Sequence, residues 1–107
     1  MGPVLNWLCS QLRGPPKQPD DLDGSLLKLY QTNREFPLQN WTYMESDRLR
    51  GEARLHELQD LLAADGDIEN TYREIIRVQT KLADIAEQQD KHKRVVDYMI
   101  ALQTWRG

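Results

Sequence analysis

The chain has 107 residues, which is enough for one small domain but not for two full-sized ones. Charged residues make up 29% of it and hydrophobic residues 39%, and the net charge of −3 excludes a strong positive field that would attract nucleic acid or anionic membranes. The single cysteine, Cys9, excludes an internal disulfide and a cysteine-based zinc site. No apolar run reaches the roughly 20 residues that span a bilayer.

Residues 1–13 are expected to form a short docking helix, because apolar residues recur there at helical spacing. About ten residues are too few for a stable isolated helix, so this segment must pack on something else. The segment lacks the basic start and continuous apolar core of a signal peptide. We therefore expect an intracellular protein, in the cytoplasm or the nucleus.

Residues 14–24 read as a proline-rich linker, in which Pro15, Pro16 and Pro19 remove backbone donors and acidic residues keep the chain solvated. A short helix is predicted over residues 25–36.

Either Asp23 or Ser25 can cap that helix. Pro37 should end it, because the proline ring pushes Phe36 towards an extended conformation.

The remainder, residues 40–106, predicts an αα-hairpin of two helices, 40–64 and 67–106, with Asn40 as the first N-cap. Gly66 and Asp67 form the turn, and Asp67 caps the second helix. The first helix has a seam at heptad spacing that is weak in its middle. Its members are Trp41, Met44, Arg48, Gly51, Leu55, Leu58 and Leu62.

Two overlapping stripes are candidates for the buried face of the second helix. The main one follows strict 3/4 spacing: Ile68, Tyr72, Ile75, Gln79, Leu82, Ala86, Gln89, Lys93, Val96, Ile100 and Gln103. A neighbouring stripe widens the apolar face: Val78, Leu82, Ile85, Val96 and Met99.

The second helix contains no proline or glycine before its end and would be roughly 57 Å long at 1.5 Å per residue. Residues 87–94 contain no apolar side chain, so the helix either bridges solvent there or breaks and folds back. The absence of helix-breaking residues favours the continuous helix.

The sequence offers almost no catalytic grouping. His56 and His92 have no neighbouring cysteine or histidine that would complete a metal site, and Cys9 has no nearby base. The chain has no glycine-rich phosphate loop, and its carboxylates alternate with bases as they do on solvated helix faces. We therefore expect no enzyme activity, no metal and no cofactor.

The expected partner-binding surface lies near the C-terminus. Residues 95–105 have an apolar face that the shorter helix of the hairpin cannot reach, unless the N-terminal helices fold over it. Aromatic anchors dominate interface energetics, so the tryptophans are included. The predicted partner-binding residues are Val96, Met99, Ile100, Trp105, Trp7, Leu8 and Leu12.

The fold class predicted from these patterns is all-α: a coiled-coil-like αα-hairpin with one long C-terminal helix and short N-terminal helices. The function that fits it is a non-enzymatic protein–protein interaction module, a coiled-coil or bundle subunit or scaffold of a larger complex, joined by a protein partner or by its own copies. The alternative is a helical nucleic-acid-binding module that uses the basic face Arg77–Arg94. We expect no small-molecule substrate and no membrane span.

Overall fold

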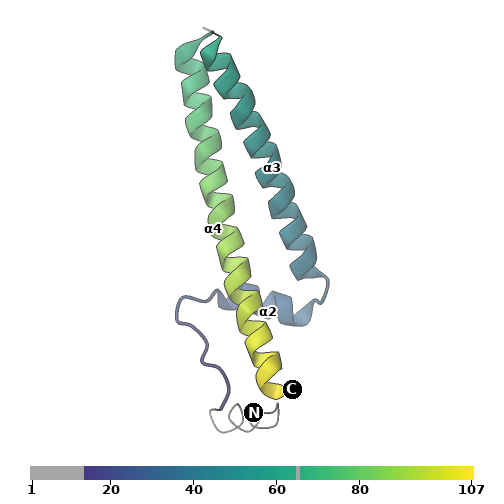
Figure 1. Ribbon diagram of the computed structural model, residues 1–107. Helices are drawn as coiled ribbons and strands as arrows, with labels where there is room; N and C mark the ends of the chain where they lie inside the picture. The colour runs from purple at the N-terminus through teal and green to yellow at the C-terminus, as the bar shows by residue number, and fades with distance from the viewer. Residues whose placement is uncertain (1–13, 65) are drawn as a thin grey trace, which may run out of the picture. The chain divides into compact units, whose positions relative to one another are not determined.

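A computed structural model of the chain describes residues 14–64 and 66–107, and within these ranges the regular structure is entirely helical (Figure 1). The helices are α2 (Gly24–Thr32), α3 (Phe36–Ala63) and α4 (Ile68–Arg106). The predicted all-α fold with a hairpin and one long C-terminal helix is confirmed.

The described residues divide into two compact units. The hairpin unit (residues 35–90) contains α3 and the N-terminal part of α4, which lie side by side and antiparallel (Figure 1). The terminal unit comprises residues 14–34 and 91–107, so it contains the linker, α2 and the C-terminal part of α4.

Helix α2 begins where a capping side chain was expected. The Asp23 carboxylate accepts a hydrogen bond from the Leu26 backbone N–H at 3.1 Å, which satisfies one of the free donors of the first turn. The helix ends at Thr32, earlier than the predicted residue 36, because Asn33 adopts an extended conformation.

Helix α3 begins at Phe36, four residues before the predicted bound at Asn40. Pro37 occupies the first turn of α3 and does not terminate the preceding helix. A proline is tolerated in a first turn because its missing N–H would have no intrahelical partner there. The prediction placed this proline at the wrong end of a helix.

The second half of the hairpin forms as predicted. Asp67 accepts a hydrogen bond from the Asn70 backbone N–H at 3.2 Å, and α4 starts at Ile68. The helix then runs without a break for 39 residues, through the polar segment 87–94. The continuous helix is therefore correct.

The predicted α3 seam is confirmed, because each of its members is buried or half-buried. Met44 and Leu58 are the most deeply buried of them. On α4, Ile75 and Ile85 are buried and complete the apolar core of the hairpin unit.

The main prediction for the α4 seam is wrong at seven of its eleven positions, which are exposed: Ile68, Tyr72, Gln79, Ala86, Lys93, Ile100 and Gln103. Its other members, Ile75, Leu82, Gln89 and Val96, are buried or half-buried. Buried or half-buried residues one position before five of the exposed ones take their places, and these are Thr71, Val78, Ile85, His92 and Met99. The neighbouring stripe is thus the one that faces the core, because α3 lies against that side of the helix.

The terminal unit has its own small core. Leu22, Leu27, Tyr30 and Val95 are buried, and Val95 has no exposed surface. Helix α2 and the linker residues before it therefore pack against this part of α4.

Candidate interaction surfaces

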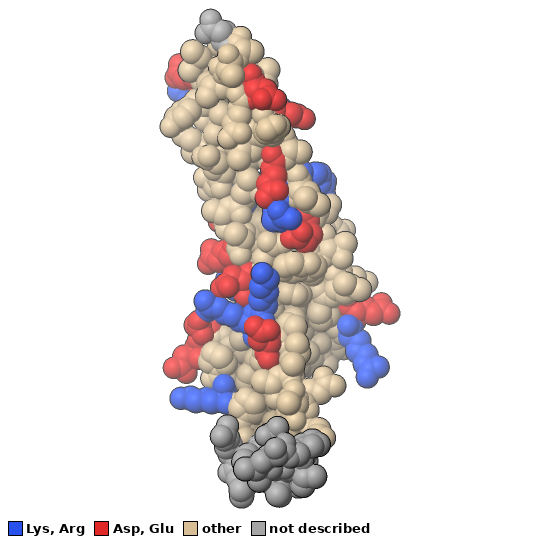
Figure 2. All heavy atoms as spheres, in the orientation of Figure 1, with Lys and Arg blue, Asp and Glu red and all other residues tan. Residues whose placement is uncertain are grey.

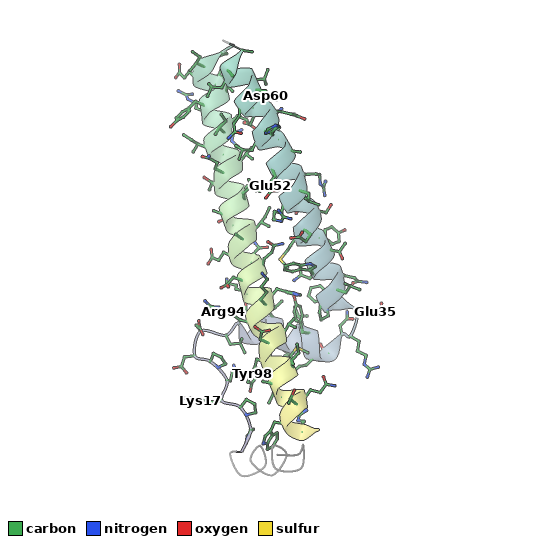
Figure 3. The ribbon with its side chains drawn as sticks, viewed as in Figure 1. Lys17, Glu35, Glu52, Asp60, Arg94 and Tyr98 are labelled. Atoms are coloured by element: carbon green, nitrogen blue, oxygen red, sulfur yellow. The ribbon has the colours of Figure 1, made fainter. Side chains whose placement is uncertain are left out.

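A polar cluster interrupts the apolar seam of the hairpin unit. The Gln89 side-chain amide donates to Glu45 Oε1 at 2.6 Å, and Arg48 donates from Nε to the same oxygen at 3.0 Å. Arg48 also donates to Glu45 Oε2 at 2.9 Å and, through its other terminal nitrogen, to Glu52 at 2.7 Å. The labelled Glu52 belongs to this group on α3 (Figure 3).

Arg48 bridges the two carboxylates of this cluster. Hydrogen bonds from Arg48 to Glu45 and Glu52 hold the pKa of Arg48 above its ordinary value. Gln89 is only 9% exposed, so the cluster supplies a partner that its buried amide needs. Two of these residues, Arg48 and Gln89, occupy predicted seam positions on α3 and α4. Polar residues at seam positions of both helices were the sequence signal that could have predicted a polar contact between the helices.

A close helix–helix approach lies next to the polar cluster. A Cβ atom on Gly51 would stand 2.7 Å from Leu82 Cδ2 and 3.2 Å from Leu82 Cγ. The glycine therefore makes room for the leucine of the opposite helix. The weak middle of the predicted α3 seam is the place where α4 supplies the larger side chain.

In the terminal unit, α2 is tied to α4 by a hydrogen bond between the Tyr30 hydroxyl and His92 Nδ1, at 2.5 Å. The two rings meet edge to face, with centroids 5.4 Å apart. Burial, followed by the positive charge of Lys93, lowers the pKa of His92 below its ordinary value of 6.5. The imidazole is therefore neutral at pH 7, and in its Nε2–H form its Nδ1 accepts a hydrogen bond from the Tyr30 hydroxyl.

An ion pair between Arg94 and Asp21 joins the linker to the same part of α4. Arg94 and Tyr98 both project from this C-terminal part of the helix (Figure 3).

The predicted partner-binding residues of α4 do not share one environment. Val96, Met99 and Trp105 are half-buried, whereas Ile100 is 56% exposed. Trp7, Leu8 and Leu12 lie outside the described residues.

Met99 also lines a shallow groove between α2 and the end of α4. The groove is formed by Tyr30, Gln31, Arg34, Met99, Leu102, Gln103 and Arg106. Among the described residues, Met99 is thus the one predicted partner-binding residue in this groove, and binding of a partner by the C-terminal residues stays a prediction.

The hairpin unit exposes a second, largely apolar surface, and three of its members, Tyr72, Gln79 and Ala86, were expected on the buried face of the helix. We call it the Tyr72 stripe. It consists of Tyr72, Ile76, Gln79, Ala83 and Ala86, all of which are exposed. Tyr72 is 57% exposed and Ile76 is 47% exposed.

The stripe runs along α4 beside the buried seam, and every member of it is uncharged. In the view of Figure 2, few charged groups lie over the N-terminal half of α4, whereas acidic and basic side chains gather over the middle of α3. The signal in the sequence was an apolar face too wide for one partner helix to cover.

The other side of the hairpin is charged. A shallow hollow there is lined by Asp47, Arg50, Gly51, Arg54, Glu74, Arg77, Val78 and Lys81. Arg77 pairs with Glu74 at 3.1 Å, and Arg50 pairs with Asp47 at 3.1 Å.

These pairs bear on the alternative nucleic-acid site. Arg77 and Arg94, the two ends of the proposed basic face, each contact a carboxylate. Phosphates would have to compete with those carboxylates. Binding of nucleic acid by this face stays a prediction.

Comparison with known protein families, with curated proteins and with solved structures finds no match to this chain. Among residues 14–64 and 66–107, no group of three or more metal-binding side chains comes together. Within the same ranges, no helix is long and apolar enough to cross a membrane. The exposed apolar side chains are therefore the features of the described residues that indicate a function.

Proposed function

We propose that the chain is a non-enzymatic helical interaction module, a subunit or scaffold part of a larger helical assembly, that binds through the Tyr72 stripe. The observation that carries the proposal is the exposure of Tyr72 and Ile76 on one uncharged side of α4. Burying each such side chain completely is worth about 1.5–3 kcal/mol, before the costs of association. A partner that covers the stripe gains this free energy.

The hairpin has the form expected of such a module. Helix α3 covers one side of α4 and leaves the adjacent side open, so a further helix can pack there as in a bundle. Partners that dock helices into such surfaces use apolar side chains at successive turns. Tyr72 and Ile76 have that spacing.

The test compares two double variants of the tagged full chain in cells. Tyr72→Glu with Ile76→Glu places two charges on the stripe. Ala53→Glu with Gln88→Glu adds the same charge at exposed positions elsewhere. We measure the proteins that co-purify, including a second copy of the chain with a different tag.

We expect the stripe variant to lose its associated proteins and the control variant to keep them, while circular dichroism reports equal helix content for both. Equal co-purification by both variants would refute the proposal.

A further inference from the structure

Side-chain size changes in one direction along the Tyr72 stripe. Its N-terminal end carries the large Tyr72 and Ile76, its centre carries Gln79, and its C-terminal end carries the small Ala83 and Ala86. From residue 72 to residue 86 the stripe is roughly 21 Å long at 1.5 Å per residue. It therefore has a bulky half and a flat half on the same side of one helix.

Such a surface is complementary to itself when it is turned around. In a two-fold symmetric interface, residue i contacts residue j and residue j contacts residue i. With the axis at Gln79 and the two α4 helices antiparallel, Tyr72 lies level with Ala86 of the other copy, and Ile76 lies within one residue of the level of its Ala83. Each large side chain then meets a methyl group.

A parallel arrangement gives the opposite result. It places Tyr72 against Tyr72 and Ala86 against Ala86, so that the helices are held apart at one end and leave a gap at the other. Gaps of that kind forfeit dispersion contacts.

The small core of the hairpin unit gives a reason for pairing. Among the described residues 35–90, the buried apolar side chains are Met44, Leu58, Ile75 and Ile85. Helical units of this size commonly need oligomerisation to bury enough apolar surface. Two hairpins packed through their stripes would form a four-helix arrangement with a larger core.

We infer that the occupant of the Tyr72 stripe is a second copy of this chain, packed antiparallel about a two-fold axis at Gln79. The inference rests on the proposed function, since it names the partner of the same surface.

The first test is sedimentation equilibrium of the purified full chain at up to about 100 μM, where a dimer with micromolar Kd is largely occupied. We expect a dimer for the parent and for Ala53→Glu with Gln88→Glu. Tyr72→Glu with Ile76→Glu should raise the Kd of the dimer at least tenfold. A monomeric parent, or a dimer that the stripe variant leaves unchanged, would overturn the inference.

The second test determines the orientation with a short bis-maleimide crosslinker, in a chain whose native thiol is removed by Cys9→Ser. Gln79→Cys should crosslink to itself across the two-fold axis, whereas Ala86→Cys should not, because its neighbour is Tyr72 of the other copy. Crosslinking at both positions would indicate parallel helices, and crosslinking at neither would place the interface elsewhere. Either result contradicts the inference.

Failure of the inference and failure of the proposed function are distinguishable. If the parent is a monomer and the stripe variant still loses other proteins in cells, the partner is a different chain and the proposed function stands. If the stripe variant keeps every association, both are wrong.

Discussion

The close approach at Gly51 gives a prediction whose sign depends on the residue across the helix interface. Replacing glycine by alanine inside a helix stabilises it by about 1 kcal/mol, because alanine loses less backbone entropy on folding. At this position the new methyl group would stand 2.7 Å from Leu82 Cδ2, a separation that forces the leucine or the helix to move. Overpacking of this kind costs about 1–3 kcal/mol.

The second effect should outweigh the first in the parent chain. We expect Gly51→Ala to lower the free energy of unfolding by about 1 kcal/mol, the difference between a packing cost near 2 kcal/mol and the propensity gain. In a Leu82→Ala background the clash is removed and only the propensity gain remains. There the same substitution should raise the free energy of unfolding by about 1 kcal/mol.

Urea denaturation of the four proteins of this double-mutant cycle, followed by circular dichroism, measures the coupling directly. The expected coupling energy is about 2 kcal/mol, and the effect of Gly51→Ala changes sign between the two backgrounds. If Gly51→Ala stabilises both backgrounds equally, Leu82 moves aside without cost and the close packing contributes nothing to stability.

Three further predictions concern the cap, the polar cluster and the C-terminal surface. Asp23→Ala should destabilise α2 by about 1 kcal/mol through loss of its N-cap, seen as faster hydrogen exchange of the α2 amides. Gln89→Glu places a second carboxylate beside Glu45, so it should lower stability at pH 7 by about 1–3 kcal/mol. Part of the lost stability should be recovered in urea titrations at about pH 4, where one carboxylate of the pair takes up a proton. Met99→Asp with Ile100→Asp should abolish association if the C-terminal residues bind a partner, while circular dichroism of the hairpin changes little; unchanged sedimentation would remove these residues from the interface.

Periodicity predicted the helices well because it depends on local spacing. The hairpin, the Asp67 cap and the unbroken α4 all follow from apolar spacing, capping chemistry and the absence of proline. The boundary at Pro37 failed because a proline suits both the end of one helix and the first turn of the next. Because the extended backbone of Asn33 already ends α2, Pro37 falls in the first turn of α3.

The choice of seam on α4 could not be made from spacing alone. The two candidate stripes share Leu82 and Val96, and both have an apolar residue near the C-terminal end of the helix, Ile100 in one and Met99 in the other. Which stripe is buried depends on where α3 lies, and that is a tertiary effect. Once α3 covers the side that contains Ile85, Tyr72 is left outside the core. The residue that sequence reasoning placed in the core therefore became the main candidate for binding.

The last prediction concerns pH and the contact between α2 and α4. Burial is the main cause of the lowered pKa of His92, and Lys93 adds to it. The unfolded chain therefore takes up the proton at a higher pH than the folded one. The stability that neutral His92 contributes is fully present above its ordinary pKa of 6.5 and is lost as the pH falls below that value, until the folded state is protonated too.

Two variants separate the effect of burying His92 from the effect of its hydrogen bond with Tyr30. His92→Gln removes the titrating group, so the difference in stability between the parent and this variant should vary with pH only below about 6.5. Tyr30→Phe removes the hydroxyl that donates to His92 and should cost about 1 kcal/mol, yet it leaves the ring buried. The pKa of His92, followed by NMR, should therefore remain low in Tyr30→Phe. A pKa of His92 at or above 6.5 in the parent would mean that burial does not control this imidazole, and that α2 does not shield it from water in solution.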